Sequence, residues 1–296
     1  MKGIVGVVGL GIMGGAMARN LAAAGWRVLG FDVDPARRGE LAADGVEDMP
    51  DLASLAAAAT VIMTSLPSPG AAAATAQGIA AAGLTERRIV IEASTLALED
   101  KLAFQQVLAA AGHVALDCPM SGTGAQARTR DLVVCASGDP NAIAAVRPIF
   151  ADFARSTQEV GAYGNGSRMK FVANLLVAIH NVASAEAMLL GIRAGLDPQQ
   201  IVEVIRAGAG NSRVFELRAP MMAKDVYEPP TMRCSTWQKD MEVIGEFAAS
   251  VGAPAPLFAA TAPIYTAAIE AGLGGQDTAA VFAVLRGMAR PAPAGS

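Results

Sequence analysis

The stretch GLGIMGGAMARNL, residues 9–21, decides how the first half of the chain folds. It follows residues 2–8, a run of β-branched residues and glycine that is uncharged after its first position. Such a run is typical of a strand buried on both faces of a sheet. Gly9, Gly11 and Gly14 have the spacing G-x-G-x-x-G, which alone is a weak signal. The elements on either side decide what it means.

A helix, a second strand and an acidic residue complete the pattern. Residues 16–24 have the composition of a helix, and Gly25 is placed to end it. Residues 27–31 form the next predicted strand, which stops at Asp32. Strand, glycine turn, helix, strand and terminal acid in this order indicate a dinucleotide-binding βαβ unit. The alternative is that the glycines form plain turns and that Asp32 caps a following helix.

Each glycine has a physical role in such a unit. Gly9 permits a tight turn, Gly11 lets the backbone approach a pyrophosphate, and Gly14 allows close packing of helix on strand. The pyrophosphate would lie at the helix N-terminus, where unpaired N–H groups and the helix dipole favour an anion. Asp32 can accept hydrogen bonds from both adenosine ribose hydroxyls and would repel a 2′-phosphate. The first half is therefore predicted to bind NAD in preference to NADP.

Strands and alanine-rich helices continue to alternate as far as residue 136. The further predicted strands are residues 61–64, 89–92, 114–117 and 132–136. This alternation predicts a doubly wound parallel sheet, whose ligands bind at the carboxyl ends of the strands. Polar or turn residues follow three of these ends, at 65–68, 93–95 and 117–124. The first two could equally be ordinary turns, whereas the third joins a hydroxyl to glycine-rich backbone that offers N–H donors to an anion.

From residue 164 the pattern changes to helices alone. Residues 167–194 predict one helix, about 42 Å long by its rise per residue. Shorter helices are predicted at 198–207, 215–223, 235–251, 259–271 and 278–290, separated by glycine or proline. The predicted fold class is α/β, an N-terminal Rossmann doubly wound sheet followed by an all-α domain that a long helix joins to it. We place the NAD-binding domain at 1–163, the helical substrate and oligomerisation domain at 164–291 with its connecting helix at 164–194, and a flexible tail at 292–296.

A polar stripe runs along the long helix. Lys170, Asn174, Val177 and Asn181 share one helical face, although the helix is otherwise almost wholly apolar. Burying an ammonium group is costly unless something requires it. The alternative is a surface lysine that lies over apolar neighbours. With a nicotinamide cofactor predicted upstream and no suitably placed histidine, we interpret Lys170 as catalytic.

Composition and charge exclude several classes of protein. A chain of 296 residues that is 53% hydrophobic with net charge −4 is an ordered globular protein, large enough for two cores. It has no basic run for nucleic acid or an anionic membrane, and no uninterrupted apolar span of about twenty residues. Its three cysteines form no CxxC pair and its two lone histidines cannot make a familiar zinc site. We therefore expect no metal, no membrane and a reducing, cytoplasmic location.

Four motifs in order resemble those of one enzyme family. They are GLGIMGGAMARNL at 9–21, DCPMSGTGAQA at 117–127, GNGSRMKFVAN at 164–174 and KDM at 239–241. In this order they are similar to the cofactor loop, the substrate-binding segment, the catalytic lysine–asparagine motif and the Lys-Asp-Leu cofactor motif of the β-hydroxyacid dehydrogenases. That family includes 3-hydroxyisobutyrate dehydrogenase and tartronate semialdehyde reductase. The resemblance covers essentially the whole chain.

The resemblance implies roles for individual residues. Lys170 would be the general acid/base at the β-hydroxyl, and Asn174 would hold the substrate beside it. The Ser121 side chain and the backbone of Gly122 and Thr123 would bind the substrate carboxylate. The cofactor would contact Gly9, Leu10, Gly11, Ile12, Met13, Gly14, Asp32, Leu66, Pro67, Thr95 and Lys239. The family also implies a homodimer or homotetramer.

The expected reaction is hydride transfer between nicotinamide and the β-hydroxyl of a small hydroxy acid, or its semialdehyde. A lysine can move the proton near neutral pH if desolvation and the positive charge of nicotinamide lower its pKa from about 10.4 toward about 7–8. The apolar helix around Lys170 would supply that desolvation.

Three departures from the family pattern leave the identity of the hydroxy acid open. Thr123 stands where the family commonly has a second glycine, and Ala173 replaces a frequent asparagine. Arg213 occupies a position where related chains often have tryptophan. If it points into the site, Arg213 could bind an anionic group of the substrate. The alternative is that it faces solvent or pairs with Glu216.

Two other functions remain open from the sequence. Imine reductases share the expected architecture, but a lysine at position 170 is atypical for them. A non-catalytic NAD-binding protein would need the glycine loop without Lys170, Asn174 and Ser121 together.

Overall fold

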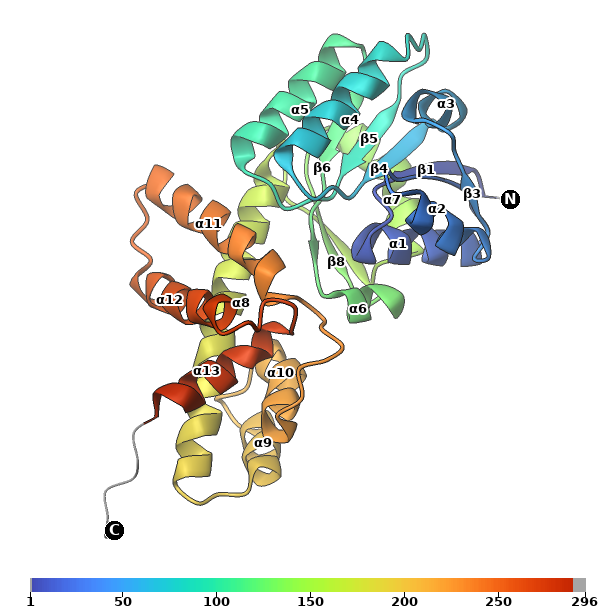
Figure 1. Ribbon diagram of the computed structural model, residues 1–296. Helices are drawn as coiled ribbons and strands as arrows, with labels where there is room; N and C mark the ends of the chain where they lie inside the picture. Colours follow the sequence, from blue (N-terminus) through green and yellow to red (C-terminus); the bar gives the residue numbers. More distant parts are fainter. Residues whose placement is uncertain (1, 290–296) are drawn as a thin grey trace. The chain divides into compact units, whose positions relative to one another are not determined.

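The computed structural model of the protein describes residues 2–289, so the predicted tail at 292–296 lies outside the described residues. The chain divides into two compact units, one ending at Phe171 and the other beginning at Val172. The division falls within one long helix, α8 (Asn165–Arg193). Figure 1 shows the strands in the first part of the chain and helices alone in the second.

The first unit contains a six-stranded parallel sheet in the order β3-β2-β1-β4-β5-β6. The strands are β1 (Ile4–Val8), β2 (Arg27–Phe31), β3 (Val46–Asp48), β4 (Val61–Thr64), β5 (Ile89–Glu92) and β6 (Val114–Asp117). The strand order reverses between β1 and β4, which is where a doubly wound sheet binds its ligand. The predicted Rossmann fold is confirmed.

Helices cover both faces of this sheet. One face packs against α1 (Ile12–Ala23), α2 (Pro35–Ala42) and α7 (Pro140–Ala151), and the other against α3 (Leu52–Ala58), α4 (Pro69–Ala81) and α5 (Leu98–Ala110). Met17 and Phe150 contribute to the first core, and Ile79 and Phe104 to the second. Because both faces are covered, the strands read in the sequence as continuous apolar runs.

One predicted strand belongs elsewhere. The run at 132–136 forms β8 (Val133–Ala136), which lies in a separate three-stranded sheet and not in the parallel one. Its neighbours are β7 (Met120–Ser121), which runs antiparallel to it, and β9 (Ser156–Glu159), which runs parallel. An apolar run shows that a strand is buried but does not name its partner, so the sequence could not separate the two sheets. A short helix, α6 (Gly124–Arg128), lies between β7 and β8 in the chain.

The rest of the chain is helical, as predicted. After α8 come α9 (Pro198–Ala207), α10 (Arg213–Lys224), α11 (Cys234–Ser250), α12 (Pro256–Glu270), a 3₁₀ turn η1 (Thr278–Ala280) and α13 (Val281–Met288). Helix α10 begins two residues before the predicted start because Ser212 accepts a hydrogen bond from the Phe215 amide and caps it. The predicted helix at 278–290 is instead η1 followed by α13, and position 290 lies beyond the described residues.

A buried polar network holds the second unit together. Asn181 of α8 donates to the Tyr265 hydroxyl and to the Thr278 carbonyl, each at 2.9 Å. The Arg218 guanidinium donates to the Thr278 hydroxyl and lies 3.5 Å from Asp277. Asn181 on the predicted stripe is therefore a structural residue of this network.

Helix α8 is also the one described helix whose length and hydropathy would suffice to cross a membrane. A long helix inside a protein meets the same criteria. Lys170, Asn174 and Asn181 on α8 are all buried, and such polar residues are rare in membrane-spanning helices.

Candidate active site

The glycine loop between β1 and α1 is as tight as a phosphate-binding turn requires. Gly9 has φ +86°, and a side chain there would meet the Ser65 carbonyl at 2.2 Å. A side chain on Gly14 would meet the Gly9 carbonyl at 1.8 Å, so α1 packs directly on the loop. In front of Gly11 the nearest atom is the end of the flexible Arg37 side chain, 3.3 Å from where a Cβ would stand. The loop thus fits a pyrophosphate, with the α1 N-terminus behind it.

Asp32 lies at the carboxyl end of β2, beside this loop. One oxygen of the buried Asp32 carboxylate accepts the Leu10 amide at 2.7 Å, and the other accepts the Asp34 amide at 2.9 Å. Each oxygen has a further lone pair, so the carboxylate can still accept a ligand hydroxyl. The Arg37 guanidinium lies 3.8 Å from Asp32.

The loop after β4 lies next to the glycine loop and is joined to the loop after β5. The Leu66 side chain lies 3.4 Å from the position of a Cβ on Gly9. The Leu66 amide donates to the Ser94 hydroxyl at 2.8 Å. Leu66 and Thr95 are half-buried and Pro67 is exposed. The predicted nicotinamide-binding residues therefore come from two loops that are fixed to one another.

The predicted carboxylate-binding segment packs against the glycine loop. A side chain on Gly124 would meet Ile12 at 2.3 Å, which brings the start of α6 onto the first turn of α1. Ser121 ends β7, and Gly122 follows with φ +138°, a conformation that favours glycine. The cofactor and substrate segments predicted from the sequence are thus neighbours in the first unit.

Thr123 has a structural task that the sequence did not reveal. Its hydroxyl caps α6, and its amide donates to the Gln126 side chain at 3.0 Å, which makes a capping box. Gln126 is held in turn by the Asp131 carboxylate at 3.0 Å. The Thr123 amide is therefore engaged within the protein, whereas Ser121 and Gly122 are not part of this box.

Lys170 lies in the first two turns of α8, with 8% of its surface exposed. It is close enough to Cys135 for its charge to act on that thiol: burial raises the pKa of Cys135, and the Lys170 charge opposes the rise. Gly166 allows this approach, because a side chain there would meet the carbonyl oxygens of Asp117 and Cys135 at 2.5 and 2.6 Å. The start of α8 is thus pressed against the ends of β6 and β8.

Asn174 follows Lys170 by about one helical turn and belongs to the second unit. It is buried and donates to the Asp240 carboxylate at 3.2 Å. Lys239, the predicted cofactor residue, lies 3.8 Å from the same carboxylate. Asp240 therefore orients the Asn174 amide, a role that we did not predict although the KDM motif contains this residue.

Arg213 is the first residue of α10. It both faces solvent and pairs with Glu216, which is the alternative to a substrate contact. Its guanidinium donates to Glu216 at 2.9 Å, and 62% of its side chain is exposed. Its contact with substrate remains a prediction.

The cysteines near the site are poor nucleophiles. Burial raises the pKa of the Cys118 thiol, and the negative charge of Asp117 raises it further, so Cys118 stays protonated. In residues 2–289 no group of three or more His, Cys, Asp and Glu side chains is placed to hold a metal ion.

Known proteins match the chain over nearly its whole length. Residues 4–163 match the family described as the NAD binding domain of 6-phosphogluconate dehydrogenase, and residues 164–285 match the NAD-binding domain of NADP-dependent 3-hydroxyisobutyrate dehydrogenase. An L-threonate dehydrogenase of Cupriavidus necator is 33% identical over 98% of this chain and 98% of its own. An L-threonate dehydrogenase of Haemophilus influenzae is 30% identical over 97% and 96%.

Solved structures agree. The 3-hydroxyisobutyrate dehydrogenase of Mycobacterium tuberculosis superimposes with a TM-score of 0.87 at 29% identity, over 97% of this chain and 100% of the other. The chain belongs to the β-hydroxyacid dehydrogenase family. An imine reductase of Streptomyces aurantiacus has a TM-score of 0.61 at 20% identity, which shows a shared fold alone. This β-hydroxyacid dehydrogenase is therefore an NAD(P)-dependent oxidoreductase that acts on a hydroxy acid.

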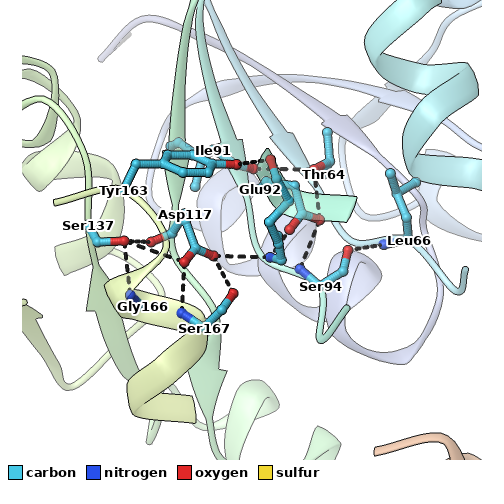
Figure 2. A network of polar contacts seen from close by, with 11 residues as sticks. Thr64, Leu66, Ile91, Glu92, Ser94, Asp117, Ser137, Tyr163, Gly166 and Ser167 are labelled. Atoms are coloured by element: carbon cyan, nitrogen blue, oxygen red, sulfur yellow. Dashed lines mark hydrogen bonds and ion pairs between the residues drawn. The ribbon is translucent and has the colours of Figure 1, made fainter. Parts of the chain in front are cut away.

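The dehydrogenase also contains buried charges that the sequence analysis missed. Glu92 and Asp117 end neighbouring strands in register, as Figure 2 shows. The Lys101 ammonium of α5 contacts the Glu92 carboxylate and lies 3.1 Å from that of Asp117. The sequence showed that both strands end in an acid, but it did not show that the two acids are adjacent or that a lysine from α5 reaches them.

Proposed function

We propose that this dehydrogenase transfers a hydride between NAD and the β-hydroxyl of a small hydroxy acid, with Lys170 as general acid/base. The observation that carries the proposal is the buried ammonium of Lys170 at the start of α8, in the same compact unit as the glycine loop and the Ser121 segment. Burying a lysine side chain costs desolvation energy, and a group that must exchange a proton with a bound substrate is one reason for a chain to accept that cost.

The proposed chemistry assigns one task to each residue. In oxidation the neutral amine of Lys170 takes the proton of the substrate hydroxyl and becomes an ammonium, and in reduction the ammonium returns that proton. The Asn174 amide, oriented by Asp240 at 3.2 Å, holds the substrate oxygen beside the lysine. The Ser121 hydroxyl and the Gly122 backbone bind the carboxylate. When bound, the nicotinamide supplies the hydride acceptor, and Leu66, Pro67, Thr95 and Lys239 hold that end of the cofactor.

NAD is the proposed cofactor, and NADP is less favoured. The support is the buried Asp32 carboxylate at the end of β2, which would repel a 2′-phosphate. Arg37, 3.8 Å from Asp32, is the residue that could weaken this preference, because its guanidinium suits a phosphate. The preference is therefore a competition between two neighbouring side chains.

We also propose that the substrate is a compact, hydroxylated acid. Two relatives are named for L-threonate and one for 3-hydroxyisobutyrate, and both are small hydroxy acids. Thr123 adds a methyl group and a hydroxyl beside Gly122, which narrows the pocket proposed there relative to glycine. In the reverse direction the substrate would be the semialdehyde where the reacting hydroxyl is primary, or the keto acid where it is secondary.

We also propose a domain boundary, an oligomeric state and a cellular location. We place the boundary between the NAD-binding and helical domains at 163/164, where the two family matches meet. A homodimer or homotetramer is supported by large apolar side chains exposed on the second unit, among them Leu190, Val204 and Leu257. A cytoplasmic location is supported by three buried thiols that form no disulfide.

One assay tests the function. The protein is incubated with NAD or NADP and with L-threonate, 3-hydroxyisobutyrate and other β-hydroxy acids, and the absorbance of the reduced cofactor is followed. We expect turnover with NAD and at least one hydroxylated acid. Turnover of cyclic imines with no turnover of any hydroxy acid would establish the imine reductase alternative. Cofactor binding without turnover of either class would indicate a non-catalytic protein.

A further inference from the structure

The first unit contains a group of buried charges that neither the cofactor loop nor Lys170 accounts for. Lys101 is 0% exposed, its ammonium contacts the Glu92 carboxylate, and it lies 3.1 Å from Asp117. The two carboxylates stand side by side at the carboxyl ends of β5 and β6. Replacing a buried ion triad by apolar residues of similar volume is often neutral or even stabilising, so such a group is weak evidence for a stabilising role. Stability alone therefore does not explain this group.

The Glu92 carboxylate is connected by hydrogen bonds to the loops after β4 and β5, which are proposed to hold the nicotinamide. Glu92 accepts the Ser94 amide at 3.0 Å and the Thr64 hydroxyl at 3.4 Å. The Ser94 hydroxyl in turn accepts the Leu66 amide at 2.8 Å. Through two hydrogen bonds, Glu92 thus fixes the backbone at Leu66, beside the glycine loop (Figure 2).

The Asp117 carboxylate is connected by hydrogen bonds to the start of α8, the helix that carries Lys170. Asp117 accepts the Ser167 amide at 2.7 Å and the Ser167 hydroxyl at 2.9 Å, and so caps the first turn of α8 (Figure 2). The Ser137 hydroxyl accepts the Gly166 amide at 2.9 Å and donates to the Asp117 carbonyl, also at 2.9 Å. Lys170 follows Ser167 on the next turn of the same helix.

We infer that Lys101 is a positioning residue that sets the nicotinamide loops and the start of α8 in register with one another. Without its charge, Glu92 and Asp117 could not both remain as neighbouring buried anions, so repulsion or the uptake of a proton would change the hydrogen bonds that the two carboxylates accept. Glu92 is hydrogen-bonded through Ser94 to Leu66, and Asp117 is hydrogen-bonded to Ser167; we call these two connections the Glu92 arm and the Asp117 arm. The backbone at Leu66 and the backbone at Ser167 would then move apart. A displacement of even 1 Å between hydride acceptor and base is enough to slow a reaction severely.

The inference rests on the proposed function, because it needs Lys170 to be the base and Leu66 to face the cofactor. It predicts a division of effects that a purely structural lysine would not produce. Loss of the Glu92 arm should raise the dissociation constant of the cofactor, and loss of the Asp117 arm should lower kcat.

Two serine variants test the arms separately while leaving every charge in place. Ser94→Ala removes the acceptor of the Leu66 amide, and we expect the dissociation constant of NADH to rise about 3–10-fold with kcat within about twofold. Ser167→Ala removes one anchor of α8, and we expect kcat to fall about 3–10-fold with NADH affinity within about twofold. NADH fluorescence gives the affinity, and absorbance gives kcat.

Lys101→Met removes the charge that joins the arms and should show both effects together. We expect kcat to fall about 10–100-fold and the NADH dissociation constant to rise about tenfold. Backbone hydrogen exchange should speed up at 64–67, 93–95 and 164–170 and stay unchanged in the remaining strands.

Arg88→Met is the matched control. Arg88 is also a buried cation of the first unit, but it directly precedes β5 and donates to the Ala56 carbonyl at 2.8 Å, at the opposite end of the strand from Glu92. Its loss should lower stability while kcat, NADH affinity and exchange at these three segments stay near those of the unmodified protein.

The results separate this inference from the proposed function. Native kinetics in Lys101→Met, or exchange that increases evenly over the whole unit, would overturn the positioning role. If Lys101→Met does not fold, the serine variants decide, and the role is wrong if each serine changes both quantities or neither. If the unmodified protein turns over no hydroxy acid, the proposed function fails, while selective exchange in Lys101→Met would still establish the coupling.

Discussion

At the scale of single residues, the proposed activity depends most on Asp32 and Lys170. The sequence points to each of them for a different reason. Asp32 follows a strand at a fixed distance from the glycine loop, and the structure places it beside Leu10 of that loop. Lys170 is conspicuous because it interrupts an apolar helix, and it is indeed buried. Lys101 gave no such signal, since LEDKLAF reads as an ordinary helix with charges on its surface.

Replacement of Lys170 tests the proposed base. We expect Lys170→Ala to lower kcat by about 100-fold or more, because no other group takes the hydroxyl proton, with NAD affinity changed less than about twofold. Lys170→Arg should fail as well, since a guanidinium does not release its proton in the working pH range. Steady-state kinetics and cofactor titration give the two quantities. Lys224→Ala, at an exposed lysine at the end of α10, is the control. Turnover in Lys170→Ala near that of Lys224→Ala would rule Lys170 out as the base.

Replacement of Asp32 tests the cofactor preference. Asp32→Ser removes the charge that would repel a 2′-phosphate, so kcat/KM should fall about tenfold with NAD and rise relative to it with NADP. Arg37 lies 3.8 Å from Asp32 and 3.6 Å from Asp34, so it would keep one carboxylate neighbour while gaining access to the phosphate. Adding Arg37→Ala to Asp32→Ser should therefore remove the gain with NADP. An unmodified protein that used both cofactors equally would show that Asp32 does not discriminate.

At the scale of elements, four strands of the parallel sheet have the predicted bounds, those at 27–31, 61–64, 89–92 and 114–117. The first strand was predicted at 2–8 but begins at Ile4. The missed strands are short or polar: Val46–Asp48 has three residues at the sheet edge, Met120–Ser121 has two, and Ser156–Glu159 has the sequence STQE. A strand without an apolar run depends on its partners for its structure, and these are not visible in local sequence.

The first turn of α8 gives a test at this scale with a built-in comparison. Gly166 and Gly70 each occupy the second position of a helix, α8 and α4. A Cβ on Gly166 would meet two carbonyl oxygens at 2.5 and 2.6 Å, whereas nothing lies within 4 Å of one on Gly70. Gly166→Ala should lower the free energy of unfolding by about 1–3 kcal/mol through overpacking. It should also lower kcat, because α8 must shift with Lys170.

Gly70→Ala should instead raise the free energy of unfolding by about 0.4–1 kcal/mol, since alanine has less freedom in the unfolded chain. Urea unfolding followed by circular dichroism measures both variants. If the two glycines responded alike, the close contact at the start of α8 would not constrain that helix.

At the scale of the whole molecule, the sequence predicted two parts and their order. It did not predict which side chains contact each other within the second part. The motif proposed to be catalytic was recognisable because its residues are close together in the chain. The partner of Asn174 was not, since Asp240 lies far along the sequence. The same holds for Arg218 and Asp277, which lie far apart in the sequence of the helical unit. Contacts of this kind are set by tertiary packing, which periodicity does not report.

The Arg218–Asp277 pair makes the stability of the second unit depend on pH. Burial alone would raise the pKa of Asp277, but Arg218 at 3.5 Å and hydrogen bonds from Thr231 and Ala279 outweigh it and hold that pKa below 3.8. The folded state therefore binds its proton less readily than the unfolded chain. The stabilisation is complete above about pH 4 and is lost as the pH falls through the lower, folded pKa.

Asp277→Asn should consequently destabilise the second unit at pH 7 by about 3–5 kcal/mol, because Arg218 is left as an unpaired buried charge. The difference from the parent should shrink as the pH falls below about 4, because the unfolded parent then binds a proton at Asp277 more readily than the folded parent does. The measurement uses a Trp26→Phe parent, in which the buried Trp237 of α11 alone reports unfolding by its fluorescence. Asp225→Asn is the control, since its pair with Arg286 is exposed to solvent and should contribute no more than about 1 kcal/mol. A loss for Asp277→Asn that is equal at pH 7 and pH 3 would show that the Asp277 charge does not stabilise this unit.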